Sequence, residues 1–270
     1  MKALKLTTCQ AINTVPVSQA IAGYLSQRLG IPVEFVGDIH WRERYRLLDA
    51  GQIDIGWICG LPYVVRFDQL DSNIELLAAP VMQAKRYQDR PIYFSDVVVR
   101  HDSPFKTFAD LRGASWAYNE PGSQSGYNIT RYHLAVLGET SGFFGRVIGT
   151  GAHRLSLRLI LKGKIDASAI DSTVLEWELH HHPEIGSQIR IIETLGPSPI
   201  PPLVVLKSVP QEIRQQLRRL LLQMEKDAEG RAILAIGHLA RFVAVQDRDY
   251  DPIRHMARQA AQVAWAANIS

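Results

Sequence analysis

The stretch from Asn119 to Asn128 combines small, hydroxyl and amide side chains where an apolar strand pattern gives way to a helical one. Its centre reads Ser123-Gln124-Ser125-Gly126. The first backbone N–H groups of a helix have no partners inside it, and their dipoles add to about half a positive charge. Small residues let an oxyanion approach, and Ser hydroxyls supply further donors. Taken alone, this local pattern favours simple N-capping by Ser123 or Ser125, with an oxyanion site as the alternative that the rest of the chain has to support.

Catalysis and metal binding have little support in the sequence. Gly122-Ser123-Gln124-Ser125-Gly126 does not have the esterase spacing, and neither a zinc signature nor a Walker loop is present. His180-His181-His182 lies near two glutamates, but adjacent histidines at a helix end point in different directions and Pro183 follows at once. A solvated helix terminus is therefore favoured over a metal site. We expect no catalytic residue, no metal and no cofactor.

The composition of this 270-residue chain is that of a globular protein of one or two domains. The net charge is only +3 and basic residues are scattered, which argues against nucleic acid as a partner. No run approaches the roughly 20 apolar residues of a membrane span. The N-terminus enters a strand pattern directly, so we expect either a cytoplasmic protein or one whose secretory leader is missing from this sequence. The chain has only two cysteines, Cys9 and Cys59, which is too few for a disulfide-rich scaffold and allows at most one disulfide bond.

Strand-like and helix-like patterns alternate along the chain. In the N-terminal part of the chain, the pattern predicts strands at 4–8, 32–36 and 54–58, with helices at 17–29 and 41–50 between them. This alternation is typical of βαβ units, whose ligands lie beyond the carboxyl ends of the strands. Further strands are predicted at 75–81, 93–100, 116–118, 146–150, 165–170, 188–193 and 203–207, and further helices at 127–137, 154–161, 173–180, 210–227, 230–239 and from 252 towards 268.

These elements predict two α/β lobes, each a mainly parallel sheet flanked by helices. The first lobe is expected to contain residues 1–95 and 196–270. The second lobe is expected to be inserted between them as residues 96–195 and to carry the oxyanion-binding helix start. Two connections, near Tyr93 and near Pro197, would form a two-strand hinge.

Several short motifs follow one another in order along nearly the whole chain. They are Gly51-Gln52-Ile53-Asp54-Ile55-Gly56-Trp57, Gly60-Leu61-Pro62-Tyr63-Val64, Gly122-Ser123-Gln124-Ser125-Gly126-Tyr127, Gly151-Ala152-His153, Ala169-Ile170-Asp171-Ser172 and Asp249-Tyr250-Asp251-Pro252. No single motif is specific, but their order and spacing together resemble the substrate-binding proteins of phosphate, phosphite and phosphonate ABC importers. That family has the type II periplasmic binding protein fold.

The resemblance implies a protein that closes its two lobes over a small phosphorus oxyanion and then docks on a membrane permease. Phosphonate, phosphite or phosphate is the implied ligand, and we expect a monomer. The family's Ser-Thr-Ser-Gly element has Gln124 in place of Thr here, and Trp41 stands where members often carry Tyr. Both departures lie at implied ligand contacts, so they concern the identity of the ligand rather than the fold.

The resemblance also assigns roles to polar residues. Ser123, Gln124 and Ser125 would donate hydrogen bonds to the anion. His153 would donate from the opposite side, the alternative being a helix N-terminal histidine without a ligand. Asp171 would repel an anion unless a proton or an amine lies between them, so it favours a protonated oxyanion or an aminoalkyl ligand. The alternative for Asp171 is an N-cap of the following helix.

Three aromatic residues are further candidates. The Tyr93 hydroxyl would close on the ligand from the first hinge strand, the alternative being a packed core tyrosine. Trp41 would cover the ligand with its ring, the alternative being a hydrophobic staple at a helix start. Tyr63, in the loop expected after the third strand, is a weaker candidate.

Two other functions stay open on the same fold. One is a cytoplasmic enzyme like those of menaquinone or thiamine biosynthesis, and the other is a ligand sensor that reports to a protein partner. The absence of a leader from this sequence and the position of Cys59 beside the expected cleft keep these readings open. Import would place the protein in the periplasm or another extracytoplasmic space.

Overall fold

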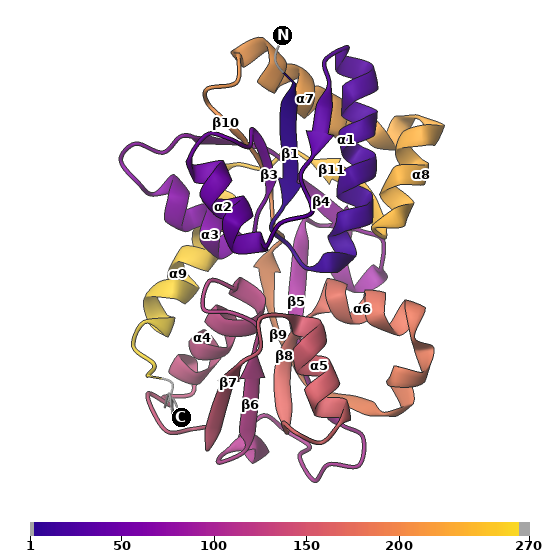
Figure 1. Cartoon of the computed structure of the whole chain (residues 1–270). Coiled ribbons are helices and arrows are strands. Elements are labelled where there is room, and N and C mark those ends of the chain that lie inside the picture. Colours follow the sequence, from indigo (N-terminus) through magenta and orange to yellow (C-terminus); the bar gives the residue numbers. More distant parts are fainter. Residues whose placement is uncertain (1–2, 265–270) are drawn as a thin grey trace. The chain divides into compact units, whose positions relative to one another are not determined.

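The computed structural model describes residues 3–264, which divide into two units (Figure 1). The first unit contains residues 3–92 and 199–250, and the second contains 93–198 and 251–264. Within the described residues the chain therefore passes between the units after residues 92, 198 and 250, whereas the sequence predicted two passages. The connections near Tyr93 and Pro197 are close to the first two of these positions.

The last helix, α9 (Asp251–Ala260), belongs to the second unit, so its predicted place in the first lobe was wrong. It packs against α4 (Ile129–Val136), and the Arg131 guanidinium donates to the Val263 carbonyl at 2.8 and 3.2 Å. The helical pattern showed that this segment buries one face, but it did not show which unit covers that face. Within the described residues α9 ends at Ala260, and the end predicted near 268 lies outside them.

The first unit contains a mixed sheet with the strand order β11-β4-β10-β3-β1-β2. β1 pairs in parallel with β2 and β3, whereas β10 is antiparallel to β3 and β4, and β11 is antiparallel to β4. The sheet is therefore mixed rather than mainly parallel. Its strands are β1 (Leu4–Thr8), β2 (Val33–Phe35), β3 (Ile55–Trp57), β4 (Ile74–Met82), β10 (Leu203–Leu206) and β11 (Leu239–Val243), of which β11 was not predicted.

One helix of the first unit, α3 (Gly60–Phe67), was predicted as a loop because it begins with Gly60 and contains Pro62. A proline in the first helical turn is tolerated, since its missing N–H would have no partner inside the helix. The other helices of this unit are α1 (Val15–Leu29), α2 (Trp41–Asp49), α7 (Gln211–Gln223) and α8 (Ala228–Ile236), with short 3₁₀ turns η1 (Ile12–Thr14), η2 (Lys85–Tyr87), η6 (Met224–Lys226) and η7 (Asp247–Tyr250).

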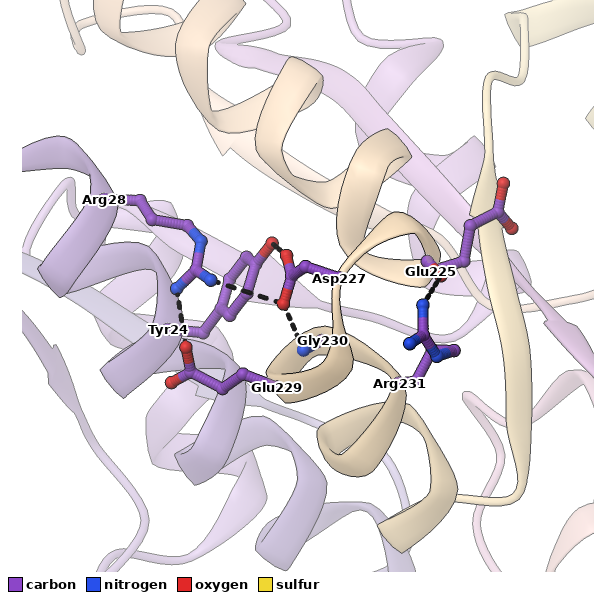
Figure 2. Close-up of polar contacts among 7 residues, drawn as sticks. All are labelled: Tyr24, Arg28, Glu225, Asp227, Glu229, Gly230 and Arg231. Carbon is purple, nitrogen blue, oxygen red and sulfur yellow. Dashed lines mark hydrogen bonds and ion pairs between the residues drawn. The ribbon is translucent and has the colours of Figure 1, made fainter.

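A polar cluster joins α1 to the start of α8 (Figure 2). Tyr24 donates from its hydroxyl to Asp227 Oδ2 at 2.8 Å, and Asp227 Oδ1 accepts from Gly230 N at 2.7 Å as the N-cap of α8. Arg28 lies over the Tyr24 ring and pairs with Asp227 and Glu229. Burial and the bond to Asp227 raise the pKa of Tyr24 to about 12. The Tyr24 hydroxyl therefore stays protonated and acts as a donor.

The second unit contains a sheet with the order β7-β6-β8-β5-β9. β6 runs parallel to β7 and β8, while β5 is antiparallel to β8. Trp116 of β6 is fully buried in an aromatic core with Phe108, Phe143 and Phe144. The strands are β5 (Ile92–Arg100), β6 (Ser115–Tyr118), β7 (Arg146–Gly149), β8 (Ala167–Asp171) and β9 (Ile189–Pro199).

The remaining helices of the second unit lie between these strands along the chain. They are the 3₁₀ turn η3 (Ala109–Leu111), the π-helix η4 (Gln124–Asn128), which leads into α4, then α5 (His153–Leu161), α6 (Ser172–His181) and the 3₁₀ turn η5 (Pro183–Ser187). Among the helices of residues 3–264, none has the length and apolar character needed to cross a membrane.

Candidate functional site

The predicted oxyanion-binding stretch forms a strand, a short turn and a helix start, as expected. β6 ends at Tyr118, and a π-helical turn begins at Gln124, where Asn128 N donates to Ser123 O at 3.0 Å. Ser123 is the N-cap: its backbone is extended, and its Oγ accepts from Gly126 N at 3.0 Å. Ser123 thus plays the N-capping role, and because its Oγ acts as an acceptor there, its own hydrogen remains to be donated.

Ser125 brings the helix start into contact with His153, the first residue of α5. Ser125 Oγ lies 3.0 Å from His153 Nε2 and 3.4 Å from Ser123 Oγ. His153 is 5% exposed, and this burial lowers its pKa to about 4, with the Ala169 backbone offsetting part of the effect. The imidazole is therefore neutral at pH 7. A neutral imidazole has one donor and one acceptor nitrogen, so it can either donate to or accept from the Ser125 hydroxyl.

Asp171 ends β8 and is the N-cap of α6. Its Oδ1 accepts from Thr173 N at 2.9 Å and from Thr173 Oγ1 at 2.7 Å. Asp171 is 8% exposed, and burial raises its pKa to about 6, against the lowering effect of hydrogen bonds from Thr173 and Ser125. The carboxyl is therefore mostly ionised at pH 7, so an acceptor lies among the donors at the helix start.

Gly126 fits between two other side chains of this site. A Cβ added to Gly126 would lie 2.1 Å from Asn119 Oδ1 and 2.9 Å from His153 Cε1. A glycine is required here because Asn119 and His153 occupy the space of a side chain. Asn119 was not singled out from the sequence, where the only signal was its position directly after a strand.

The Gln124 side chain makes its hydrogen bonds within the protein. Its side chain is fully buried, its Nε2 donates to Ser198 Oγ at 3.2 Å and to Met256 Sδ at 3.1 Å, and its Oε1 accepts from Asn128 Nδ2 at 2.7 Å. Both ends of the amide thus bond to protein groups. In this structure the side chain ties η4 to β9 and α9, and its contact with a ligand stays a prediction.

The three aromatic candidates lie in different places. Tyr93 is a buried residue of β5 in the second unit. Trp41 is half-buried at the first position of α2 in the first unit, with its ring edge-on to Tyr45 at 6.1 Å. Contact of Tyr93 or Trp41 with a ligand stays a prediction.

Tyr63 lies on α3, not in a loop, and its side chain is fully buried in the first unit. Its hydroxyl donates to Asp247 Oδ1 at 2.9 Å, and its ring contacts Tyr250 at 4.7 Å between centroids. These contacts explain Tyr63 as a packing residue of the first unit.

The histidine run at the end of α6 makes local contacts. His181 stacks on Trp177 at 4.0 Å, and its Nδ1 lies 2.8 Å from the Trp177 carbonyl oxygen. Across the described part of the chain, no group of three or more His, Cys, Asp or Glu side chains has an arrangement that could hold a metal ion.

Comparison with known proteins connects this chain to one family. The model of a family described as "ABC transporter, phosphonate, periplasmic substrate-binding protein" matches residues 12–250. The phosphonates-binding periplasmic protein of Escherichia coli (strain K12) is 22% identical over 211 residues, which are 76% of this chain and 60% of that protein. A probable ABC transporter phosphite-binding protein of Prochlorococcus marinus (strain MIT 9301) is 21% identical over 243 residues, covering 87% of this chain and 81% of that protein.

A solved structure shows the same fold. PhnD1 from Prochlorococcus marinus (MIT 9301), in complex with methylphosphonate, superposes with a TM-score of 0.83 at 18% identity and covers 97% of this chain and 99% of that chain. The chain belongs to the family of phosphonate ABC-transporter periplasmic substrate-binding proteins. The predicted family and the predicted two-lobed α/β fold are thus confirmed, although this chain spans 60% of the length of the Escherichia coli relative.

Proposed function

We propose that this protein is the substrate-binding component of an ABC importer and that it binds a small phosphorus oxyanion. Family membership supports the first part. The second part is carried by one observation: Ser125 Oγ lies within 3.4 Å of both Ser123 Oγ and His153 Nε2 at the front of a helix. Hydroxyls, an imidazole and helix-end N–H groups are the donors that an oxyanion requires.

The electrostatics of the site fit a ligand with one negative charge better than one with two. η4 and α4 together present their positive dipole end at Ser123, and each hydrogen bond to a charged oxygen is worth about 1.5–3 kcal/mol. His153 is neutral at pH 7 and adds no positive charge, while Asp171 is mostly ionised. We therefore infer that the ligand carries a hydrogen for Asp171, on a protonated oxygen or on an amino group, as phosphonates and phosphite can.

The partner and the location follow from the family alone. Members are periplasmic components of ABC transporters, so we propose a membrane permease as the partner and an extracytoplasmic site of action. We propose no catalytic activity, because the family consists of substrate-binding components. Methylphosphonate in the related structure supports phosphonates as the first ligands to test.

Calorimetric titration with methylphosphonate, an aminoalkyl phosphonate, phosphite, phosphate and sulfate tests this proposal. A phosphorus oxyanion at a hundred times its dissociation constant should also stabilise the protein by about 2.7 kcal/mol. Ser125→Ala combined with His153→Ala should abolish binding and leave the protein folded. Ser187→Ala combined with His182→Ala, both exposed in the same unit, is the matched control and should bind normally. Unchanged affinity in the first double variant, or no binding of any phosphorus compound by the parent protein, contradicts the proposal.

A further inference from the structure

The Asn119 side chain ends in a polar atom that the fold leaves unsatisfied. Asn119 follows β6 directly, and its Oδ1 is buried without a hydrogen-bond partner among the described residues. Buried polar side-chain atoms in native proteins nearly always have a partner, so an exception at a candidate binding site calls for an explanation.

The backbone of Asn119 is held between the two segments that carry the site. Its carbonyl accepts from Gly151 N at 2.7 Å, and the neighbouring Tyr118 carbonyl accepts from Thr150 N at 2.8 Å. These bonds join the end of β6, which leads to Ser125, to the loop that leads to His153. The side chain therefore starts from a fixed point between the two residues that form the proposed oxyanion site.

The carboxamide lies against the first turn of η4. Asn119 Oδ1 and His153 Cε1 are 2.1 and 2.9 Å from the same point, the position of a Cβ on Gly126. Gly126 N–H already donates to Ser123 Oγ, and His153 Nε2 already contacts Ser125. Neither of these two groups is bonded to Asn119, whose polar end lies beside the helix front and the imidazole.

We propose that Asn119 is an additional ligand-binding residue of this site and that its Nδ2 donates a hydrogen bond to an anionic oxygen of the ligand. The two ends of a carboxamide are nearly equal in size, so a half-turn of the side-chain amide places Nδ2 where Oδ1 lies, with the same packing. An oxyanion offers more acceptor lone pairs than hydrogens, and Asp171 already provides an acceptor. The orientation of the Asn119 carboxamide that points Nδ2 at the ligand therefore matches an oxyanion better than the one that points Oδ1 at it. This inference rests on the proposed oxyanion-binding function.

Two substitutions with nearly the shape of asparagine test the inference by calorimetry with methylphosphonate and phosphite. Asn119→Leu removes both polar ends, and we expect the dissociation constant to rise about 10- to 100-fold, the effect of losing one hydrogen bond to a charged oxygen. Asn119→Asp replaces the donor by a negative charge, and we expect a rise of at least about 100-fold. The control Asn73→Asp makes the same chemical change at an exposed position of the first unit and should leave affinity within about twofold.

A measurement on the unsubstituted protein covers the case in which these variants do not fold. In nitrogen-15 spectra, one side-chain amide proton of Asn119 should shift downfield when methylphosphonate or phosphite is added. Parent-like affinity in Asn119→Leu, tighter binding in Asn119→Asp, or an unshifted Asn119 amide in the ligand-bound protein each overturns the inference and leaves the proposed function intact. No binding of either probe by the parent protein overturns both.

Discussion

Ser125 Oγ lies 3.0 Å from His153 Nε2, although the two residues are 28 positions apart in the chain. Ser125 also hydrogen-bonds to Asp171 and lowers the pKa of that carboxyl. A hydroxyl has one hydrogen to donate, so it cannot donate to the imidazole and to the carboxylate at the same time. The protonation of His153 and that of Asp171 are therefore linked through Ser125, and a ligand at this point would change both.

The two buried groups should have opposite effects on stability between about pH 4 and pH 6.5. The pKa of His153 is about 4 in the folded protein and 6.5 ordinarily, so the unfolded chain binds more protons in this range. The free energy of unfolding then falls by about 3 kcal/mol as the pH drops from 6.5 to 4. For Asp171 the folded pKa is about 6 against 3.8, so the folded protein binds more protons and stability rises by about 2 kcal/mol over the same decrease.

Substitution of either residue should uncover the contribution of the other. We expect Asp171→Asn to lose about 2 kcal/mol relative to the parent protein between pH 6.5 and pH 4, and His153→Gln to gain about 3 kcal/mol. Urea unfolding of the three proteins at pH 7, 5.5 and 4.5 measures these differences. Parallel pH responses in all three proteins would show that these groups do not titrate as their burial indicates.

Gly126→Ala should damage the site, because its Cβ would lie 2.1 Å from Asn119 Oδ1 and 2.9 Å from His153 Cε1. Relief of this overlap has to move Asn119 or His153, and overpacking of this kind typically costs about 1–3 kcal/mol. We expect oxyanion affinity to fall at least about 100-fold in calorimetric titrations. Gly122→Ala, in the same loop and with open space around its Cβ, is the control. Equal affinities in the two variants would show that the site tolerates the displacement.

The ion pair between Arg154 of α5 and Glu178 of α6 should support the second unit. Glu178 is 5% exposed, and the Arg154 guanidinium also lies over Trp177, with its Cζ 5.4 Å from the ring centroid. Glu178→Gln leaves a partly buried arginine without its carboxylate, so we expect a loss of about 2 kcal/mol in urea unfolding, less than for a fully buried pair. Glu184→Gln changes an exposed glutamate of the same unit and serves as the control. If Glu178→Gln lowers the free energy of unfolding no more than Glu184→Gln does, the ion pair does not stabilise the second unit.

The cluster of Figure 2 gives a prediction for the first unit. Tyr24→Phe removes the buried hydroxyl that donates to Asp227, and we expect the free energy of unfolding to fall by about 1 kcal/mol. Gly23→Ala, one position earlier in α1, meets nothing within 4 Å and should raise stability by about 0.5–1 kcal/mol through helix propensity. Circular dichroism during urea unfolding measures both changes. Equal stabilities of Tyr24→Phe and the parent would show that the hydroxyl is as well bonded to water in the unfolded chain.

Residues whose environment is local were predictable. A helix start capped by Ser123 and the strands around it were expected, because capping chemistry and apolar periodicity depend on near neighbours in the chain, whereas the π-helical form of the first turn was not predicted. The helix α3 was missed because Gly60 and Pro62 resemble loop signals, although proline is compatible with a first helical turn. Asn119 was missed because its importance depends on Gly126 and His153, which the sequence does not place beside it.

The sequence alone determined the family, the alternation of strands and helices and the serine-rich helix start. Each of these depends on residue types and their spacing along the chain. Only the tertiary structure decided that Gln124 bonds to Ser198 and Met256 and that α9 packs with the second unit. The physical reason is that burial and hydrogen bonding of a side chain depend on segments far away in the chain. Patterns in neighbouring residues do not show which of these distant segments packs against a given side chain.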